Sequence, residues 1–542
     1  MQSNKTFSIF FIGFFTLYIF SVLVHLSTMP LDGEEPRRAL VSIEMLKSGN
    51  YIWPTAFGWE YFNKPPVFNW ILSVLIFLTG SVKEWVIRLP SLICLLAWGF
   101  AHYAFTKKFF PKNIAILSAL FLVTGFELFF YALANGGEID IFYSFLVYLQ
   151  IMFLFYFHQQ REWLKLFIWS YFFCAIGFLT KGFPSLFFQE FTLIALCVFD
   201  RSVKIFFRWQ HFIGIMFFCF LVGAYLYVYN FYSSPQRLIV NLLSECFQKS
   251  AVGEHSERLW EKVFLYPFSF FKLLLPSGLL LLLLFKKHNY RLRTDPLVQF
   301  SILFIIFNIW MYAFTGRPIL RYVYMFVPFA LNIIVYIFWK TNEEYPALIN
   351  KIFKNAVYLF FILLIVIIGL PFFVTVPLTP LVILSLLTIG FILFYIKTSI
   401  NKVWAFCLGL VLVRMVYAVL LIPVQVKYKT INYRNVVEDM LHANKGQNIT
   451  YWSEPEVFDV GLDLKYWNWK FESVITPPRF TNHMIPYYWY YHTGMLMKYD
   501  TALLSNKTYF TTLPKLKGRD VSLVWSWYDK RWKTQLLLFR KK

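Results

Sequence analysis

Long apolar runs, separated by short polar loops, fill most of the first 423 residues of the chain. Each run approaches the roughly 20 residues that an α-helix needs to cross a bilayer. The pattern predicts thirteen membrane-spanning helices, at residues 7–28, 86–105, 113–131, 139–157, 163–180, 183–199, 209–230, 263–285, 298–315, 319–339, 354–374, 377–396 and 403–422. We therefore predict a polytopic α-helical membrane protein over residues 1–423, with the first apolar run retained as a signal anchor.

Residues 424–542 have a mixed polar and aromatic pattern, with no apolar run long enough to span a bilayer. Helical periodicity predicts a helix at Tyr433–Asn444. Short strands are predicted at Ile449–Trp452, Val474–Thr476, Tyr509–Thr511, Val521–Trp525 and Thr534–Phe539. This pattern is typical of a small α/β domain. The aromatic segment Tyr487–Tyr491 fits either a membrane interface or packing inside that domain.

The polar loop at residues 30–85, between the first two spans, contains two helical patterns. Arg37–Ser48 has apolar residues along one helical face, so we expect a short helix on the membrane surface. Val67–Leu78 is apolar but too short to span comfortably, so we expect a second interfacial helix. Two such helices would roof a cavity at the outer leaflet.

Composition and charge agree with a membrane protein and set its orientation. The chain is 58% hydrophobic with a mean hydropathy of +0.56, which excludes a soluble globular protein. Lysine and arginine favour cytoplasmic loops, and here they gather in alternate loops such as 107–112, 201–208 and 286–293. The N-terminus is therefore expected in the cytoplasm, and the 30–85 loop and residues 424–542 outside. The net charge of +22 is spread over many loops, which indicates topology and not a nucleic-acid surface.

Neither cysteine nor histidine forms a pattern of ligands. The six cysteines are widely spaced, and no two of the nine histidines lie three or four residues apart. No disulfide framework, metal site or other cofactor is therefore predicted. Paired carboxylates in the first loop leave a divalent cation as the alternative.

Four groups of polar residues meet on the outer side of the membrane in this topology. They are Asp32, Glu34, Glu35, Arg37 and Lys64 of the first loop; Glu138 and Asp140 at the start of the fourth span; Lys181 at the turn after the fifth span; and Arg317, Arg321 and Tyr322 at the turn into the tenth. Fixed cations can hold a lipid-linked phosphate and stabilise the charge that develops on it as a bond breaks. A carboxylate can take the proton of an attacking hydroxyl group. The set therefore indicates transfer of a group away from a lipid phosphate.

Each group also has a purely structural interpretation. Glu34, Glu35 and Arg37 could pair within their own helix, and Lys64 could be a snorkelling lysine beside a rigid turn. Lys181, Arg317 and Arg321 could be interfacial anchors. Glu138 suits a solvated acid at a helix start. Asp140 is the hardest to explain structurally, because it lies inside an apolar span.

Several short motifs resemble a known family. They are EEPR at residues 34–37, EML at 44–46, YFNKPP at 61–66, RLPS at 88–91, LTKG at 179–182, and the segment from Arg317 to Arg321 and Tyr322. In this order they resemble the lipid-linked-sugar transferases of the GT-C class. The chain is most similar to the superfamily of ArnT-like 4-amino-4-deoxy-L-arabinose transferases and protein O-mannosyltransferases.

The resemblance implies roles for individual residues. Glu34 matches the family's proposed catalytic acid, with Asp32 as the competing candidate, and Asp140 matches a second acidic site. Lys64, Lys181 and Arg321 would hold the donor phosphate, with Arg37 and Tyr322 beside them. Glu35, Glu138 and Arg317 are further candidates, and His255 belongs to an outer loop that would close over lipid. Asn63 stands where the family usually has glutamate.

The implied activity is inverting transfer of a sugar from a polyprenyl-phosphate donor, at the outer face of a bacterial inner membrane. The implied acceptor is lipid A or another envelope lipid, and a protein acceptor is the alternative within the superfamily. A transporter of polyprenyl-linked sugars is the alternative from another class. A transporter is expected to carry polar residues near the bilayer midplane, whereas the ionisable groups here gather at one face.

Overall fold

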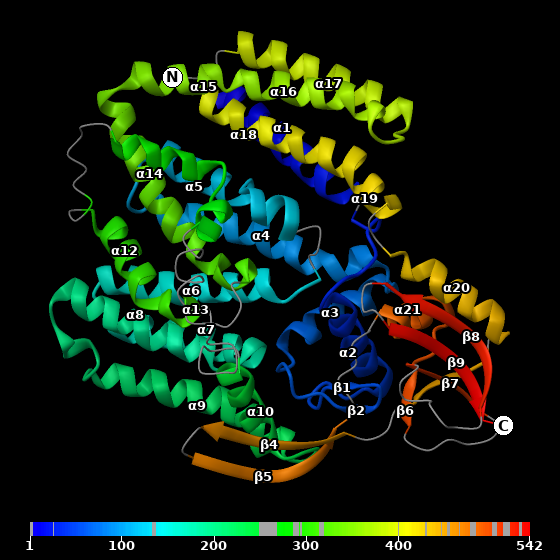
Figure 1. Ribbon diagram of the computed structural model, residues 1–542. Helices are drawn as coiled ribbons and strands as arrows, with labels where there is room; N and C mark the ends of the chain where they lie inside the picture. The colour runs from blue at the N-terminus through cyan, green and yellow to red at the C-terminus, as the bar shows by residue number, and fades with distance from the viewer. Residues whose placement is uncertain are drawn as a thin grey trace.

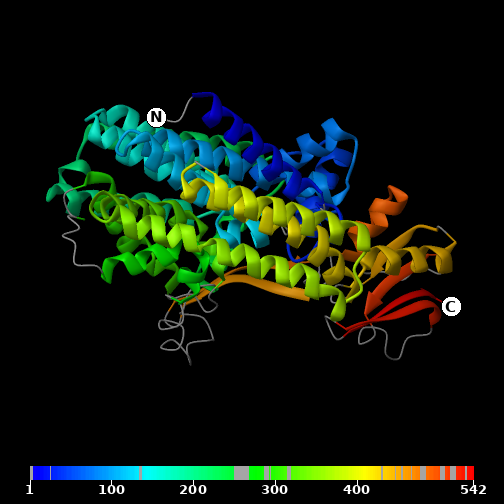
Figure 2. The same ribbon diagram turned by 90° about the horizontal axis from the view of Figure 1, so that it is seen from above.

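The computed structural model consists of a large helical part and a smaller C-terminal part that contains strands β3 to β9 (Figures 1 and 2). The description covers residues 4–24, 26–132, 137–248, 268–285, 292, 295–313, 319–398, 400–428, 431–445, 447–452, 456–464, 467–476, 484–500, 507–512, 521–530 and 534–541.

The helical part begins with α1 and the first loop. Its elements are α1 (Asn4–Leu23), α2 (Glu35–Ser48), β1 (Thr55–Ala56), β2 (Trp59–Glu60), α3 (Val67–Thr79), α4 (Glu84–Thr106), α5 (Lys112–Val123), the π-helix η1 (Glu127–Ala132), α6 (Asp140–Gln159), α7 (Trp163–Lys181), α8 (Pro184–Asp200), η2 (Val203–Ile205), α9 (Trp209–Tyr229) and α10 (Pro235–Gln248). The series continues with η4 (Ser277–Phe285), α12 (Pro296–Asn308), α13 (Trp310–Ala313), η5 (Leu320–Phe326), α14 (Val327–Glu344), α15 (Pro346–Asn355), α16 (Val357–Gly369), η6 (Leu370–Phe372), α17 (Leu378–Lys397), α18 (Lys402–Val416), η7 (Tyr417–Leu421) and α19 (Ile422–Tyr428).

Eight helical stretches of the described chain are long and apolar enough to cross a membrane: Glu84–Thr106, Asp140–Gln159, Trp163–Lys181, Trp209–Tyr229, Leu320–Glu344, Pro346–Phe372, Leu378–Lys397 and Lys402–Tyr428. All eight coincide with predicted spans. The predicted spans at 7–28, 113–131, 183–199 and 298–315 contain apolar stretches of fewer than 18 described residues, at Ile9–Leu23, Lys112–Val123, Pro184–Asp200 and Pro296–Asn308. The span at 263–285 is only partly described. The fold class, a polytopic α-helical membrane protein, is confirmed, and the count of thirteen stays a prediction.

The C-terminal part contains α20 (Tyr433–Asn444), β3 (Ile449–Trp452), β4 (Glu456–Leu464), β5 (Trp467–Thr476), α21 (Met484–Thr493), β6 (Lys498–Asp500), β7 (Thr508–Thr512), β8 (Val521–Asp529) and β9 (Thr534–Lys541). Five strands form a mixed sheet in the order β6-β3-β7-β9-β8, in which β3 runs parallel to both of its neighbours. Strands β4 and β5 form a separate antiparallel hairpin, which lies along α10 of the helical part (Figure 1). The predicted α/β character is confirmed.

The two parts share one hydrophobic core. It joins Leu40 of α2 and Phe68 of α3 to Trp489 of α21 and Leu538 of β9. The helix predicted at Arg37–Ser48 is present as α2, and it is buried between α3 and α21. Its position on the membrane surface stays a prediction. Of the two interpretations of the aromatic segment 487–491, packing inside the protein is correct, because the first three of its side chains are buried.

A glycine sets the closest approach between α18 and its neighbours. A Cβ atom at Gly409 would collide with the Phe360 ring of α16 and lie 3.1 Å from the Phe391 ring of α17. We expect Gly409→Val to lower the melting temperature of the detergent-solubilised protein, because overpacking costs about 1–3 kcal/mol. Gly390→Val in α17 is the matched control, since no atom lies within 4 Å of its added Cβ. Equal melting temperatures for the two variants would contradict this account.

Candidate active site

A buried arginine fixes the segment that leads into α2. The Nε and Nη2 atoms of Arg88 in α4 donate to the two carboxylate oxygens of Glu35, at 2.9 and 2.8 Å. Its Nη1 donates to the carbonyls of Leu26 and Met29, at 2.8 and 2.9 Å, and Nη2 donates to the carbonyl of Pro30 at 3.0 Å. Both side chains are almost fully buried. All five N–H donors of the guanidinium group are thus used.

Glu35 uses its remaining acceptor capacity on two backbone amides. Its carboxylate accepts from the N–H of Asp32 at 2.9 Å and from the N–H of Gly137 at 2.7 Å. A Cβ at Gly137 would lie 2.8 Å from a methyl carbon of Ile87 and 3.1 Å from the Cβ of Glu35. Glu35 therefore joins three parts of the chain: the segment before α2, the helix α4, and the segment before α6. This is a structural role.

Glu34 lies at the start of α2 and remains accessible. Its carboxylate pairs with Arg37 at 2.9 Å and lies 3.7 Å from Arg38, and 40% of its side chain is exposed. Partial burial acts to raise the pKa of Glu34. The positive charges of Arg37, Arg38, Lys64 and Arg321 outweigh this effect and hold the pKa below its usual range. Glu34 is therefore ionised at neutral pH.

A second cluster of charges lies at the starts of α6 and η5. Nη1 of Arg321 donates to both carboxylate oxygens of Glu138, and its Nε lies 3.4 Å from Asp140. The ammonium of Lys181 donates to Asp140 at 2.6 Å. The same ammonium lies 4.9 Å from the ring centroid of Tyr143 and 4.5 Å from that of Tyr322. Two cations, two carboxylates and two aromatic rings thus form one compact group.

The two clusters meet at Gly33. This residue has φ +59°, in the left-handed region that favours glycine, and a Cβ there would lie 3.0 Å from a carboxylate oxygen of Glu138. Burial and the negative charge of Asp140, with a smaller effect of Glu35, raise the pKa of Glu138 to about 8 against the opposing charge of Arg321. The structure therefore brings an ionised acid and an acid of raised pKa to one site.

The other predicted residues have less specific surroundings. Oδ1 of Asp32 accepts from the neighbouring N–H of Gly33 at 2.5 Å. The ammonium of Lys64 donates to the carbonyl of Asn63 at 2.8 Å, and its charge acts on Glu34. His255 and Arg317 lie outside the described residues.

Three residues of the site were not among the predicted ones. Arg88 could have been found as an arginine inside an apolar span, which calls for a buried partner. Tyr143 follows Asp140 by three residues and so shares its helix face. Arg38 is buried, contacts Glu34, and donates to the hydroxyl of Tyr61; its sequence position beside Arg37 gave no sign of this difference.

The described residues contain no group of three histidine, cysteine, aspartate or glutamate side chains placed to hold a metal ion. The carboxylates of Glu34, Glu35, Glu138 and Asp140 instead face basic side chains. This donor set does not favour the alternative of a divalent cation.

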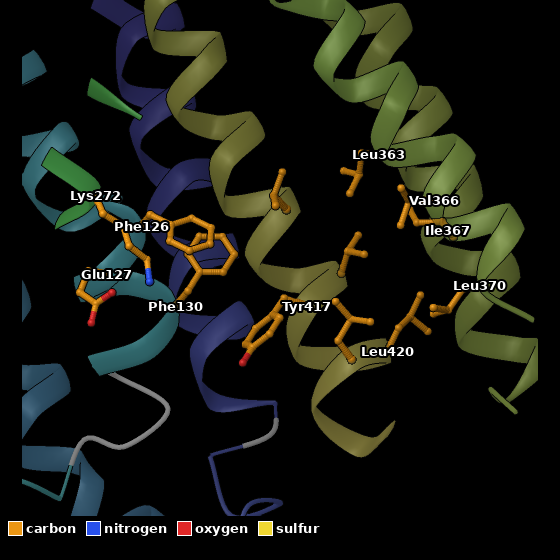
Figure 3. Close-up of a pocket in the computed structure, with 13 residues that line it drawn as sticks. Phe126, Glu127, Phe130, Lys272, Leu363, Val366, Ile367, Leu370, Tyr417 and Leu420 are labelled. Atoms are coloured by element: carbon orange, nitrogen blue, oxygen red, sulfur yellow. The ribbon is translucent and has the colours of Figure 1, made fainter. Parts of the chain in front are cut away.

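A cavity of about 390 Å³ lies apart from these charges, between η1, α16 and α18. Figure 3 shows Glu127 and Lys272 on one side of it, facing Leu363, Val366 and Ile367 of α16. None of the predicted site residues lines this cavity.

Comparisons with known proteins identify the fold. ArnT from Cupriavidus metallidurans superposes in its apo state with a TM-score of 0.69, over 99% of this chain and 98% of that chain, at 13% sequence identity. The chain has the ArnT fold. The structure of the same ArnT bound to undecaprenyl phosphate also gives a TM-score of 0.69, at 14% identity and 97% coverage of both chains.

Sequence similarity to ArnT-like proteins is confined to part of the chain. Residues 63–227 match the family described as dolichyl-phosphate-mannose-protein mannosyltransferase. A Photorhabdus laumondii relative, named undecaprenyl phosphate-alpha-4-amino-4-deoxy-L-arabinose arabinosyl transferase, is 25% identical over 203 residues. This alignment spans 35% of the chain and about a third (36%) of that relative. The resemblance to the ArnT-like superfamily is thereby confirmed.

The Arg88–Glu35 pair predicts a large effect on stability. Arg88→Leu would leave the carboxylate of Glu35 buried without its cation, and breaking such a pair costs about 3–5 kcal/mol. We expect a clear drop in the melting temperature of the solubilised protein. Arg161→Leu is the control, because Arg161 is 66% exposed and 3.6 Å from its partner Asp200, so its loss is worth about 1 kcal/mol at most. A similar drop for both variants would contradict the structural role of Arg88.

Glu138 predicts a pH dependence of stability. Its pKa is raised from 4.5 to about 8 in the folded protein, so between these values the unfolded chain binds fewer protons than the folded one. Stability therefore decreases as the pH rises through this range. We expect Glu138→Gln to flatten the melting temperature of the protein plotted against pH from 5 to 8. Glu343→Gln, at an exposed ion pair, is expected to leave the slope unchanged; a slope unaltered by Glu138→Gln would refute the assignment.

Proposed function

We propose that this protein is an inverting glycosyltransferase that moves a sugar from a polyprenyl-phosphate donor to an envelope lipid. The observation that carries the proposal is the meeting of Glu34 with the Glu138, Asp140, Lys181 and Arg321 cluster at Gly33. The ArnT fold supports it, as does the named activity of the Photorhabdus relative. The structure of ArnT with undecaprenyl phosphate supports the choice of an undecaprenyl-phosphate donor.

Basic side chains are assigned to the donor phosphate. In our proposal the donor phosphate binds Lys64, Lys181 and Arg321, with Tyr322 beside it. In the structure Lys181 donates to Asp140, and Arg321 donates to Glu138. These two acids hold the basic side chains in place before the donor binds. Preorganised cations need no rearrangement when the charge on the phosphate oxygen grows in the transition state.

In the proposal Glu34 is the acid that binds and orients the acceptor, and Asp32 is the alternative candidate for this role. The acceptor oxygen attacks the anomeric carbon, the bond from this carbon to the phosphate oxygen breaks, and polyprenyl phosphate leaves with the electron pair. A carboxylate of lowered pKa is a weak base, so Glu34 is better suited to orient the acceptor than to remove a proton from a hydroxyl group. An acceptor phosphate, which is an anion near neutral pH, needs no proton removed.

In the proposal the chain has two domains with a defined orientation in the membrane. Residues 1–423 form the membrane domain, in which the 30–85 loop carries the catalytic acid, and residues 424–542 form an extracytoplasmic domain. The N-terminus is cytoplasmic and the site faces the outer side of a bacterial inner membrane, where lipid A is the favoured acceptor. A protein acceptor is the alternative within the same chemistry.

Transport of polyprenyl-linked sugars is less well supported. Polar side chains do lie in the middle of the spans: Gln150 of α6 donates to Gln189 of α8 at 2.9 Å and to the carbonyl of Ser185 at 3.1 Å. These groups are buried and bind one another, as polar residues that join packed membrane helices do. None of them lines the cavity between η1, α16 and α18.

The decisive experiment measures sugar transfer from an undecaprenyl-phosphate donor into extracted envelope lipid by the purified protein. We expect Glu34→Gln and Lys64→Ala to lower transfer by about 10²-fold or more, the size of effect typical of a lost orienting or charge-stabilising group, and Asp32→Asn to remain active. Glu162→Gln, at an exposed ion pair with Lys165, is the control.

Loss in Asp32→Asn with an active Glu34→Gln would move the catalytic acid to Asp32. A wild-type protein that binds donor but transfers nothing to lipid or protein acceptors, together with substitutions that leave binding unchanged, would overturn the enzyme assignment in favour of transport.

A further inference from the structure

We infer that the C-terminal domain positions the catalytic acid, because Tyr488 accepts a hydrogen bond from the backbone segment that precedes Glu34 and Arg434 donates one to it. This inference rests on the proposed function and adds to it a role for residues 424–542. Tyr488 and Arg434 are positioning residues, because each acts on Glu34 through the backbone of the segment at residues 26–34.

Glu84, the first residue of α4, is the anchor of the contact. Its side chain is 1% exposed, and its Oε1 accepts from Nε of Arg434 at 2.7 Å and from the hydroxyl of Tyr488 at 3.0 Å. Arg434 comes from α20 and Tyr488 from α21, so one buried carboxylate binds two helices of the C-terminal domain. Such a buried carboxylate is stabilised only when charged or polar partners surround it.

Both partners also bind the segment that carries the catalytic acid. The hydroxyl of Tyr488 accepts from the N–H of Leu31 at 2.9 Å, and Nη2 of Arg434 donates to the carbonyl of Ser27 at 2.6 Å. Leu31 directly precedes Asp32 and lies three residues before Glu34. The C-terminal domain therefore contacts the backbone directly before Asp32 and three residues before Glu34.

This segment has no regular structure of its own, so side chains must satisfy its backbone groups. Arg88 of the membrane domain binds three of its carbonyls, and the C-terminal domain supplies the partners of Leu31 and Ser27. The path of the backbone into Glu34 thus depends on both domains. Membrane-domain contacts alone leave the N–H of Leu31 without its acceptor.

Packing adds to these hydrogen bonds. Leu31 is 1% exposed, and Ile485, Tyr488 and Trp489 of α21 are fully buried in the same hydrophobic cluster as Leu40 of α2. The segment and the helix that follows it therefore pack in the same hydrophobic cluster as α21. A shift of α21 would therefore change the packing around Leu31, which precedes Glu34, and around Leu40 of α2, which follows it.

Two neighbouring tyrosines provide a matched test in the full-length protein. Tyr488→Phe removes the acceptor of the Leu31 N–H. Tyr487→Phe removes an equally buried hydroxyl of the same helix, but this hydroxyl donates to the carbonyl of Val82 in the α3–α4 connection. Both variants lose one buried hydrogen-bonding group, and only the first touches the catalytic segment.

We expect Tyr488→Phe to lower kcat for sugar transfer at least tenfold, with less than a twofold change in KM for the undecaprenyl-phosphate donor. Tyr487→Phe is expected to keep the kcat of the wild type while its melting temperature falls by a similar amount. Equal kcat values for the two folded variants would overturn the inference. Absence of transfer by the wild type would instead refute the proposed function.

Hydrogen exchange gives a second readout that does not depend on activity. The amide of Leu31 is expected to exchange faster in Tyr488→Phe than in the wild type or in Tyr487→Phe. If Tyr488→Phe does not fold, Arg434→Lys serves as the second variant, because lysine keeps the charge beside Glu84 but lacks the fork that also reaches Ser27. An unchanged Leu31 exchange rate in folded Tyr488→Phe, or an unchanged kcat in folded Arg434→Lys, would contradict the positioning role.

Discussion

The buried ion pair between Arg88 and Glu35 is the interaction on which the rest of the site depends. Burying a charge in a membrane-embedded protein is costly unless all its hydrogen-bonding groups have partners. Here all five N–H groups of the Arg88 guanidinium donate, to one carboxylate and three backbone carbonyls. The same carboxylate accepts from the backbone on both sides of the site, before α2 and before α6. This shared pair brings Glu34 next to Glu138.

Adjacent acids consequently have different roles. Glu34 and Glu35 are neighbours in sequence, but consecutive residues of a helix point in directions about 100° apart. Glu35 points into the protein toward Arg88, and Glu34 remains 40% exposed among cations. A similar division separates Arg38, which is buried against Tyr61, from Arg37, which pairs with Glu34 near the surface.

Local elements could be predicted from the sequence because local patterns determine them. The helix at Tyr433–Asn444 and the strand at Ile449–Trp452 have the predicted bounds, since apolar periodicity and β-branched residues mark them. The strand β4 was missed because Asp459, Gly461 and Asp463 interrupt its apolar pattern. The partners of Glu138 and Glu84 could not be predicted, because Arg321 and Arg434 lie 183 and 350 residues further along the chain. The candidate residues themselves were recognisable from their charge and their place in the topology.

The hydrogen bond between Leu31 and Tyr488 also has a consequence for biogenesis. It joins residues 457 positions apart, and at a synthesis rate of about 5–20 residues per second roughly 20 to 90 s pass between the emergence of the two. The first loop is therefore made, and its flanking helices inserted, long before its last partner exists. Completion of this site is tied to the end of translation, so a nascent chain arrested before α21 has all its apolar spans but an unfinished first loop.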